Sequence, residues 1–412
     1  MRRGKNVLFI SYDGLTDPLG QSQVIPYLTG LTRYGYEFTI ISCDKKENYK
    51  AHSVQVRALL SKFPIRWISL PYHKSPPVLS SMLDLYRIKQ TIRKLQAEDH
   101  FDCVHTRPGL PTLAALWMKK KYGTLFVNDI RGFWADERVD GNMWNLKNPL
   151  YKQVYRFFKT HESECLEKAD HNICLTHAAK KEILSWQNKN RQIKIDVIPC
   201  SADLSLFDPL KIVADEQENL RQKLKIDPND MVITYLGSIG GWYFVEEMMR
   251  FFKILSGSIP TAKFLFISPH RHEQIREAAM KESIPLEKII IASAQRNEVP
   301  VLLSLSSYSI FFIRPCYSKI SSSPTKHGEI MAMGIPVISN GGVGDVKEIV
   351  EKYKSGFIVP DFSDESFTKA VSEIKQSPVF CKQNIRAGAE EVYNLKNAIE
   401  SYRKVYDSLM KI

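Results

Sequence analysis

The chain has 412 residues, of which 44% are hydrophobic and 25% are charged. This length is well above the roughly 100 to 200 residues of one domain, so we expect two domains with separate cores. The composition is typical of a globular protein and excludes disorder, collagen-like repeats and coiled coil for most of the chain. The sequence has no uninterrupted run of about 18 apolar residues, so we do not expect a membrane span. The apolar stretch near the start is too short to predict a cleavable signal.

Charge and cysteine usage point to partners and compartment. Residues 1–200 hold 31 Lys and Arg against 19 Asp and Glu, whereas residues 201–412 hold 26 of each. A basic half suggests an anionic partner, such as nucleic acid, an anionic bilayer or a phosphorylated substrate, although a merely solubilising surface explains the charge equally well. The seven cysteines are scattered and never spaced C-x-x-C, so we expect free thiols in a reducing cytoplasm rather than disulfides or a zinc site.

Short apolar, β-branched runs alternate with helical patterns in both halves. The predicted strands are 7–11, 38–42, 65–70, 101–105, 125–128, 171–175 and 194–198, then 231–236, 264–268, 288–292, 309–313, 336–339 and 356–359. Near-continuous apolar strands between helices indicate parallel sheets covered on both faces, so we expect an α/β fold of two doubly wound domains.

The predicted boundaries follow from composition. We expect a first domain over residues 1–200, a linker and first helix over 201–230, and a second domain over 231–394. Residues 395–412 have the apolar spacing of an amphipathic helix that packs on another part of the protein. Ligands of open parallel sheets lie beyond the carboxyl ends of the strands, so the loops there are the candidate sites.

Two strand-to-helix loops are candidates for anion binding. After the first strand, Gly20 and Gln21 precede a helical pattern, and after strand 231–236 come Gly237, Ser238 and two further glycines within five positions. Glycine lets a ligand approach backbone donors at a positive helix end, which suits a diphosphate. Plain turns remain the alternative. Neither loop is G-x-G-x-x-G, which argues against a dinucleotide oxidoreductase.

Candidate functional residues are most closely spaced between residues 321 and 345. We expect Ser323 to cap a helix that starts at Pro324, and Asp345 to cap the next helix. Lys326 and Glu329 share one face of the first helix and can hold a phosphate and a sugar diol, unless they only form an exposed ion pair. The glycine loop before the second helix is a further anion cradle.

This stretch resembles the carboxyl-domain signature of glycosyltransferase family 4, retaining sugar-nucleotide-dependent enzymes of the GT-B fold. The segments that carry the resemblance are 14–23, 128–137, 197–207, 237–243 and 323–344. The resemblance implies two Rossmann-like domains that face each other across a cleft, with the acceptor bound by the first domain and the nucleotide sugar by the second. It also implies that the final helix crosses back onto the first domain.

The resemblance implies roles for individual residues of the second domain. Glu329 matches the glutamate that contacts the donor ribose, and Ser321 stands where the family often has another glutamate. The basic pair that relatives carry after strand 231–236 is missing here, so Lys326 with Arg314 is the predicted diphosphate clamp. The remaining donor-binding residues are predicted to be Gly20, Gln21, Gly237, Ser238, Arg296 beside the nucleobase, Ser323, Thr325, Gly342, Val343, Gly344 and Asp345.

In the first domain, many relatives have a sugar-contacting histidine after the strand that matches 125–128. This chain has Asp129 and Arg131 there, which are predicted to position sugar or acceptor, or else to brace the neighbouring loop. His105, at a strand end, and Lys74, in a loop, are the candidate acceptor contacts. A strand-end histidine such as His105 is also often structural.

No D-x-D motif occurs in the chain, so we predict no metal and no other cofactor. Lys, Arg and helix dipoles then stabilise the leaving diphosphate of a UDP or GDP sugar. With Lys326, Glu329, Asp129 and Arg131 as the catalytic set, the expected activity is retaining transfer to a lipid-linked or saccharide acceptor. The product would belong to a surface polysaccharide or glycolipid such as lipopolysaccharide.

Basic and apolar residues of the first half support contact with the inner face of an anionic membrane. They are Arg87, Lys89, Arg93, Lys94 and Lys119–Lys121, near Met82, Leu83, Leu85 and Trp117. A solvated basic face is the alternative, and nucleic acid is disfavoured because no nucleic-acid motif accompanies the charge. Two other functions stay open: a sugar-nucleotide epimerase on the same fold, and a non-catalytic membrane-associated binding protein.

Overall fold

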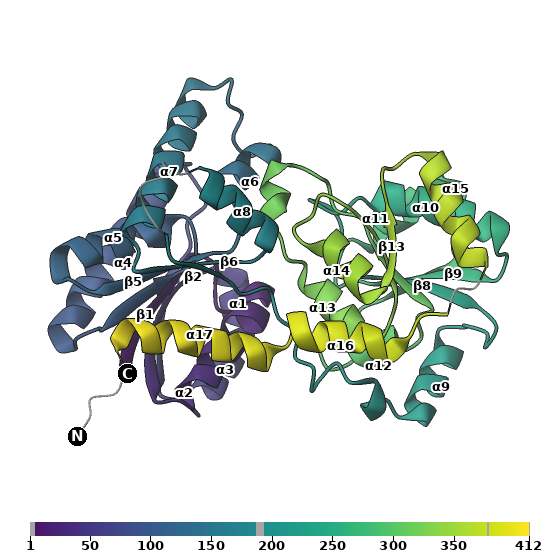
Figure 1. The fold of residues 1–412 in the computed structure, drawn as a ribbon, viewed down its shortest axis with the longest axis horizontal. Helices are drawn as coiled ribbons and strands as arrows, with labels where there is room; N and C mark the ends of the chain where they lie inside the picture. Colours follow the sequence, from purple (N-terminus) through teal and green to yellow (C-terminus); the bar gives the residue numbers. More distant parts are fainter. Residues whose placement is uncertain (1–4, 187–192, 377–378, 412) are drawn as a thin grey trace. The chain divides into compact units, whose positions relative to one another are not determined.

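The structure, a computed structural model, describes residues 5–186, 193–376 and 379–411. The chain forms two compact units, Met1–Pro199 with Leu395–Ile412 and Cys200–Asn394 (Figure 1). Each unit is built on a parallel sheet, which confirms the predicted fold of two α/β domains. The segment 201–230, predicted as linker and first helix, lies within the second unit.

All thirteen predicted strands are present among the described residues, with differences at their ends. The first sheet has the order β3-β2-β1-β4-β5-β6-β7 and the second β10-β9-β8-β11-β12-β13. The strands are β1 (Lys5–Ser11), β2 (Tyr36–Asp44), β3 (Ile65–Pro71), β4 (Cys103–Thr106), β5 (Leu125–Ile130), β6 (His171–Cys174), β7 (Ile195–Val197), β8 (Met231–Leu236), β9 (Ala262–Ile267), β10 (Ile289–Ala292), β11 (Tyr308–Phe311), β12 (Val337–Asn340) and β13 (Gly356–Val359).

Helices connect successive strands in both units. In the first unit they are α1 (Pro18–Gln23), α2 (Ile25–Thr32), α3 (Lys46–Leu60), α4 (Leu79–Glu98), α5 (Leu110–Tyr122), α6 (Trp134–Asp140), α7 (Pro149–Lys168), α8 (His177–Ser185) and α17 (Leu395–Met410). In the second they are η1 (Pro209–Lys211), α9 (Ala214–Lys223), α10 (Val245–Ser258), α11 (His272–Lys281), η2 (Leu286–Lys288), α12 (Val299–Leu303), η3 (Tyr317–Ser321), α13 (Thr325–Ala332), α14 (Val346–Tyr353), α15 (Asp364–Lys375) and α16 (Lys382–Val392). None of the described helices is long and apolar enough to cross a membrane.

The first sheet has a hydrophobic core on each face because successive strand side chains point to opposite sides. Val7 and Phe9 of β1 pack with side chains of α2, α3 and α17. Leu8 and Ile10 pack with side chains of α4 and α5 on the other face. This double burial explains why the strand reads as a continuous apolar run rather than an alternating one.

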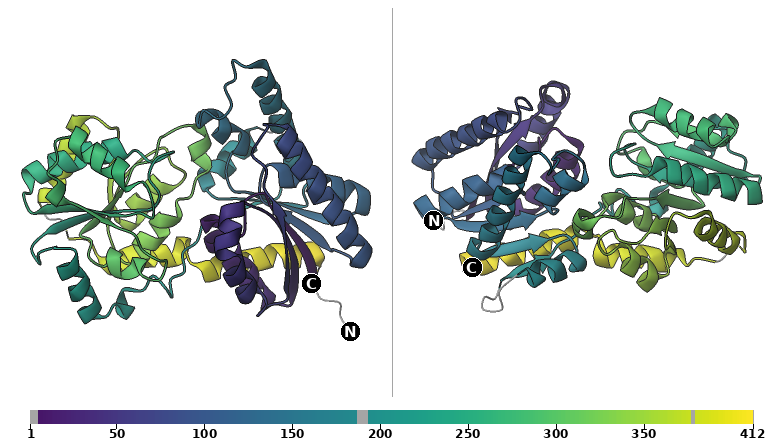
Figure 2. Two further views of the ribbon diagram at one scale, coloured as in Figure 1. Left: turned by 180° about the vertical axis from the view of Figure 1, so that it is seen from behind. Right: turned by 90° about the horizontal axis from the view of Figure 1, so that it is seen from above.

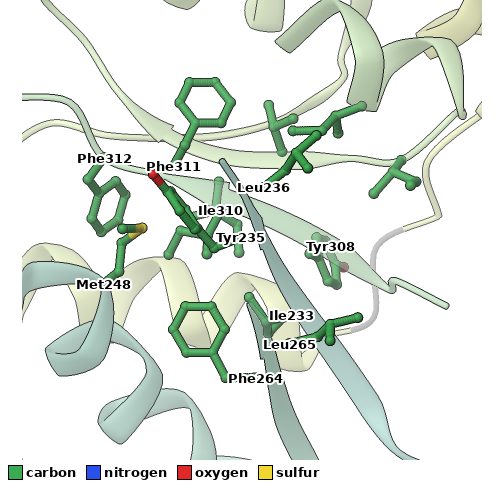
Figure 3. Packing of buried hydrophobic residues seen from close by; sticks show 14 of the residues in the cluster. Ile233, Tyr235, Leu236, Met248, Phe264, Leu265, Tyr308, Ile310, Phe311 and Phe312 are labelled. Atoms are coloured by element: carbon green, nitrogen blue, oxygen red, sulfur yellow. The ribbon is translucent and has the colours of Figure 1, made fainter. Parts of the chain in front are cut away.

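The second sheet is covered in the same manner. Its core combines Tyr235 of β8, Phe264 of β9 and Ile310 of β11 with Met248 of α10, all fully buried. Figure 3 shows these side chains gathered around the strands. The core fixes the strand ends from which the functional loops depart.

The last helix, α17, belongs to the first unit although it follows the second unit in sequence. Its buried residues Ala398, Tyr402, Val405 and Tyr406 form one apolar stripe. The stripe packs on the α2 and α3 side of the sheet, and Figures 1 and 2 both draw α17 beside α2.

Two tyrosines of this stripe also make buried polar contacts. The Tyr402 hydroxyl donates to Asp129 Oδ2 at 2.9 Å, and the Tyr406 hydroxyl lies 2.5 Å from His105 Nδ1. A buried carboxylate that loses a donor keeps the full cost of its dehydration, so these hydroxyls hold α17 in place.

We predict that Tyr402→Phe lowers the free energy of unfolding of the first unit by about 1–3 kcal/mol, because Asp129 Oδ2 loses its hydroxyl donor. Urea denaturation followed by circular dichroism measures this change. The matched control is Tyr34→Phe, at a tyrosine that is 45% exposed, for which the expected change is within about 0.5 kcal/mol. Equal stability of the two variants would contradict a stabilising role for the Tyr402 hydroxyl.

Candidate functional site

In the second unit, three loops beyond the carboxyl ends of β8, β11 and β12 are tied together by backbone hydrogen bonds. The Gly237 turn (residues 237–243) meets the segment after β11, where Arg314 N donates to the Trp242 carbonyl at 2.9 Å. The loop after β12 joins them, because Gly344 N donates to the Lys319 carbonyl at 2.8 Å. The loops therefore form one continuous edge of the sheet, the edge at which parallel sheets bind ligands.

Lys326, on the first turn of α13, extends into this edge beneath the Gly237 turn. Its side-chain nitrogen lies 3.6 Å from the centre of the Tyr243 ring, 4.3 Å from that of Tyr235, and 3.2 Å from the Tyr235 hydroxyl oxygen. Gly237 has φ of +125°, and a Cβ there would come within 2.7 Å of the Lys326 nitrogen. The positive φ favours glycine at this position, and the absence of a Cβ leaves the space that the Lys326 nitrogen occupies.

The environment of Lys326 disfavours its charged form. Lys326 is 7% exposed, and burial lowers its pKa to about 7, although the charge of Glu329 acts in the opposite direction. Among the described residues, no carboxylate lies within 4.0 Å of its nitrogen, so an anion arriving at this site would supply the missing counter-charge.

Glu329 lies one turn further along α13 and is 6% exposed. Its Oε1 is 2.9 Å from an Arg296 guanidinium nitrogen, and Arg296 also stacks on the ring of Phe207 at 5.4 Å. Burial raises the pKa of Glu329 and the charge of Arg296 opposes that shift. The alternative of an exposed pair between Lys326 and Glu329 is therefore wrong: both side chains are buried, and Glu329 pairs with Arg296.

Two further cations lie on the same edge. The Lys319 nitrogen lies 3.8 Å above the Trp242 ring, and the Arg314 guanidinium lies 5.9 Å from that ring. Gly342 and Gly344 both have positive φ, and a Cβ on Gly342 would touch Pro315 at 3.1 Å. Val343 between them is buried. The glycine loop is thus packed closely against the cationic segment after β11.

Of the two helix starts predicted at this edge, that of α13 is corrected by one residue and that of α14 is confirmed. Pro324 is the N-cap of α13 and Thr325 its first residue, while the Ser323 hydroxyl accepts from Cys200 N at 3.2 Å instead of capping. Asp345 does occupy the N-cap position of α14, but its side chain makes no capping hydrogen bond. Ser238 is exposed, and its carbonyl accepts from the Tyr235 hydroxyl.

In the first unit, Gly20 and Gln21 lie within α1 rather than in an open loop. A Cβ on Gly20 would come within 2.4 Å of the Gly14 carbonyl oxygen, so this glycine serves the packing of α1 on the preceding loop. Gln21 donates its amide to the Thr16 carbonyl at 3.1 Å. These contacts account for both residues without a ligand, and donor binding by them stays a prediction.

The structure brings Asp129, Arg131 and His105 together beneath α17. His105 Nε2 lies 3.5 Å from Asp129 Oδ2, and Arg131 donates to the Tyr402 hydroxyl at 3.2 Å. Burial alone would raise the pKa of Asp129, but the charge of Arg131 and the hydrogen bond to His105 lower it. These positions favour a structural role in anchoring α17, and roles in catalysis or acceptor binding stay predictions.

Lys74 is exposed in the loop after β3, next to a part-buried network of hydrogen bonds centred on the buried Asp84. His73 Nδ1 lies 2.5 Å from Asp84 Oδ1, and Arg87 lies 3.1 Å from His73 Nε2. Tyr12, which follows β1, donates its hydroxyl to Asp84 at 2.9 Å. These hydrogen bonds hold the loop that carries Lys74 at the carboxyl ends of β1 and β3.

Sequence reasoning missed four contributors to the edge of the second sheet: Tyr235, Tyr243, Lys319 and Arg271. Arg271 donates to the Ile239 carbonyl at 3.1 Å and thereby shapes the Gly237 turn. Arg271 lies four residues after β9, at the carboxyl end of a strand, and this position could have marked it as a candidate. No sequence signal marks Tyr235 and Tyr243 as partners of Lys326, because tyrosines at strand ends are common in hydrophobic cores. Among the described residues, no group of three or more His, Cys, Asp or Glu side chains is placed to hold a metal ion.

Comparisons with known proteins agree with this architecture. The family model "Glycosyl transferases group 1" matches residues 216–391, and the model "Glycosyltransferase Family 4" matches residues 23–206. No curated protein matches the chain.

Solved structures share the fold at low sequence identity. A glycosyltransferase from Rickettsia africae has 17% identity and a TM-score of 0.71, with 99% of this chain and 100% of that chain covered. Sucrose-phosphate synthase from Thermosynechococcus elongatus has 14% identity and a TM-score of 0.71, with 99% of each chain covered. HepE of Anabaena with UDP-glucose bound has 13% identity and a TM-score of 0.69, with 98% and 99% covered.

These likenesses identify the two parallel-sheet units as the Rossmann-like domains of the GT-B fold. The two family models together account for most of both units. The chain therefore belongs to the group 1 glycosyltransferases, enzymes that transfer a sugar from a nucleotide sugar.

Proposed function

We propose that the chain transfers a sugar from a UDP or GDP sugar to a lipid-linked or saccharide acceptor with retention of anomeric configuration, in the assembly of a surface polysaccharide or glycolipid. The observation that carries the donor assignment is the burial of Lys326 beneath the Gly237 turn, with no carboxylate of the described residues within 4.0 Å of its nitrogen. Lys319 and Arg314 on the same edge add cations that suit a diphosphate. HepE, bound to UDP-glucose, supports a nucleotide sugar of this kind.

In the proposed reaction, the bond between the sugar anomeric carbon and the diphosphate breaks, and a bond from that carbon to the acceptor oxygen forms on the same face. The acceptor proton passes to the departing phosphate oxygen. Lys326, charged once the diphosphate binds, stabilises the leaving group, and Glu329, held by Arg296, accepts hydrogen bonds from the ribose hydroxyls. We propose that these cations make a metal ion unnecessary.

Thermal unfolding with UDP, GDP, ADP or CMP, each in excess and with EDTA present, tests the donor class. A ligand at about 100 times its dissociation constant stabilises by roughly 2.7 kcal/mol, a shift of a few degrees. We expect UDP or GDP to produce this shift, Lys326→Ala to abolish it, and the control Lys369→Ala, at an exposed lysine on α15, to keep it. No shift with any nucleotide would favour the binding-protein alternative. Product from the sugar nucleotide alone, without acceptor, would favour the epimerase.

Proton uptake tests the role of Lys326 separately. Since its pKa is about 7 in the free protein, Lys326 is about 90% neutral at pH 8, and binding a diphosphate beside it should draw up to about 0.9 proton per nucleotide from the buffer. Nucleotide affinity should fall as pH rises above 7 for the same reason. Calorimetry in buffers of different ionisation enthalpy measures the uptake. Lys326→Met should remove it, and binding without proton uptake in the wild type would exclude this role.

We also propose peripheral contact with an anionic membrane through α4. Leu79, Met82, Leu83 and Tyr86 are 64%, 62%, 41% and 58% exposed, and their spacing places them on one side of the helix. Exposed cations accompany them on α4 and α5, as adsorption on an anionic bilayer requires. A lipid-linked acceptor would be met at such a surface.

Flotation with vesicles of equimolar phosphatidylglycerol and phosphatidylcholine tests this contact. Replacing Met82 and Leu83 by Gln removes apolar area from the stripe and should weaken binding at least several-fold. The matched control replaces Val54 and Leu59 by Gln, since these residues of α3 are exposed on the other face of the same unit. Equal flotation of both double variants would contradict insertion through α4.

A further inference from the structure

Three cations from two helices converge on one half-buried aromatic ring of the first unit. The side chains of Lys89 and Arg93 on α4 and Lys121 on α5 lie 5.7, 5.2 and 5.4 Å from the ring centre of Trp117. Lys89 and Arg93 are four residues apart and therefore share a face of α4. We call these four residues the Trp117 cluster.

Within residues 5–186, 193–376 and 379–411, the three cations of the cluster have no carboxylate partner. The acidic neighbours are used by other lysines: Glu164 pairs with Lys120 at 2.8 Å and Asp170 pairs with Lys119 at 2.5 Å. Among the described residues, no carboxylate lies within 4.0 Å of Lys89, Arg93 or Lys121. Burial, and then the charge of Arg93, lower the pKa of Lys89, so the crowding of like charges has a cost that an anion would remove.

A groove of about 430 Å³ opens beside the cluster, and this volume is within the range of ligand pockets. Leu113, Leu116 and Trp117 give it an apolar wall, while Lys120 and Lys121 stand along it with Glu164. His161 also lines the groove, but burial lowers its pKa to about 4, so it is neutral at pH 7. The groove therefore offers positive charge beside an apolar surface.

The groove is separate from the loops at the carboxyl ends of the strands. α5 begins at Leu110, just after β4 ends, and Trp117 lies about 10 Å further along the helix axis. The cluster therefore lies on the face of the sheet covered by α4 and α5, away from the α2, α3 and α17 face.

We propose that the Trp117 cluster is a phosphate-binding site, whose ligand is the phosphate of an anionic phospholipid headgroup with its glycerol and acyl portion against Leu113 and Leu116. Arg93 provides several donors in a fixed plane, and the two lysines provide point charges, which together match a phosphodiester. The assignment of the phosphate to a lipid rests on the membrane contact proposed above. The binding of a phosphate by the cluster does not depend on the proposed sugar transfer.

The test uses the full chain and a triple variant, Lys89→Gln, Arg93→Gln and Lys121→Gln. The matched control is Arg33→Gln, Lys50→Gln and Lys62→Gln, which removes the same charge from exposed positions on the α2 and α3 side of the unit. Within the part of the chain that the structure describes, these three side chains form no ion pair. Thermal unfolding of all proteins first shows that both triple variants are folded. Nucleotide should stabilise both triple variants equally. A loss of lipid binding in the cluster variant can then be told apart from a failure of the proposed nucleotide site.

In the first arm, binding to vesicles of equimolar phosphatidylglycerol and phosphatidylcholine is compared with binding to phosphatidylcholine alone. At about 1 kcal/mol for each well-placed cation, the cluster variant should lose affinity for the anionic vesicles by on the order of 100-fold. The control variant should lose much less, although the change in net charge is the same. Brominated lipids should quench tryptophan fluorescence in the wild type more than in Trp117→Phe.

The second arm titrates inorganic phosphate against the protein in the absence of lipid, with the donor site saturated by the nucleotide that stabilises it. Binding that requires the cluster, without a cluster-dependent preference for anionic vesicles, would support the phosphate site and assign it to a soluble ligand. If the cluster variant and the control variant behave alike in both arms, the cluster is a solvated basic surface and the proposal is wrong.

Discussion

The candidate donor site depends on the burial of one ammonium group. Lys326 is covered by Tyr235, Tyr243 and the Gly237 turn, where Gly237 has a positive φ and leaves room for the nitrogen. Aromatic faces partly offset the loss of water around a cation, but they do not replace a carboxylate. Burial therefore disfavours the charged form of Lys326 while no anion is bound. In the proposed function a bound diphosphate supplies the counter-charge, so its affinity would depend on the packing in the second unit's core.

The same logic separates Lys326 from the buried charges of the first unit. Asp129 is buried to a similar degree, but Arg131, His105 and the Tyr402 hydroxyl all lie around it. A buried charge with its partners present needs no ligand and stabilises the contact that joins them, in this case the packing of α17 on the sheet. Burial by itself thus says little about function, whereas the balance of partners around a buried charge says much.

Most of the fold could be predicted from the sequence because its signals are local. A strand such as β8, buried on both faces, reads as an uninterrupted apolar run, and the predicted bounds 231–236 match the structure. The start of α13 was misplaced by one residue because Ser323 can satisfy either a helix end or a distant backbone group. Its hydroxyl bonds to Cys200 N, 123 positions away. The partners of Asp129 and His105 are further still, 273 and 301 positions along the chain, and no local pattern announces them.

The net charge of a half of the chain does not report where its charged side chains lie. Residues 201–412 hold 26 Lys and Arg against 26 Asp and Glu, so their net charge is zero. The structure nevertheless gathers Lys319, Lys326 and Arg314 on one edge of the second sheet, while carboxylates such as Glu273 and Asp364 lie exposed on outer helices. Fields at a site depend on nearby charges within a Debye length of about 10 Å and not on the sum over a domain. A domain without net charge can therefore place several cations along one edge of its sheet, here beside the carboxylates of Glu329 and Asp345. The positions of charges relative to the strand ends matter more for a site than their sum.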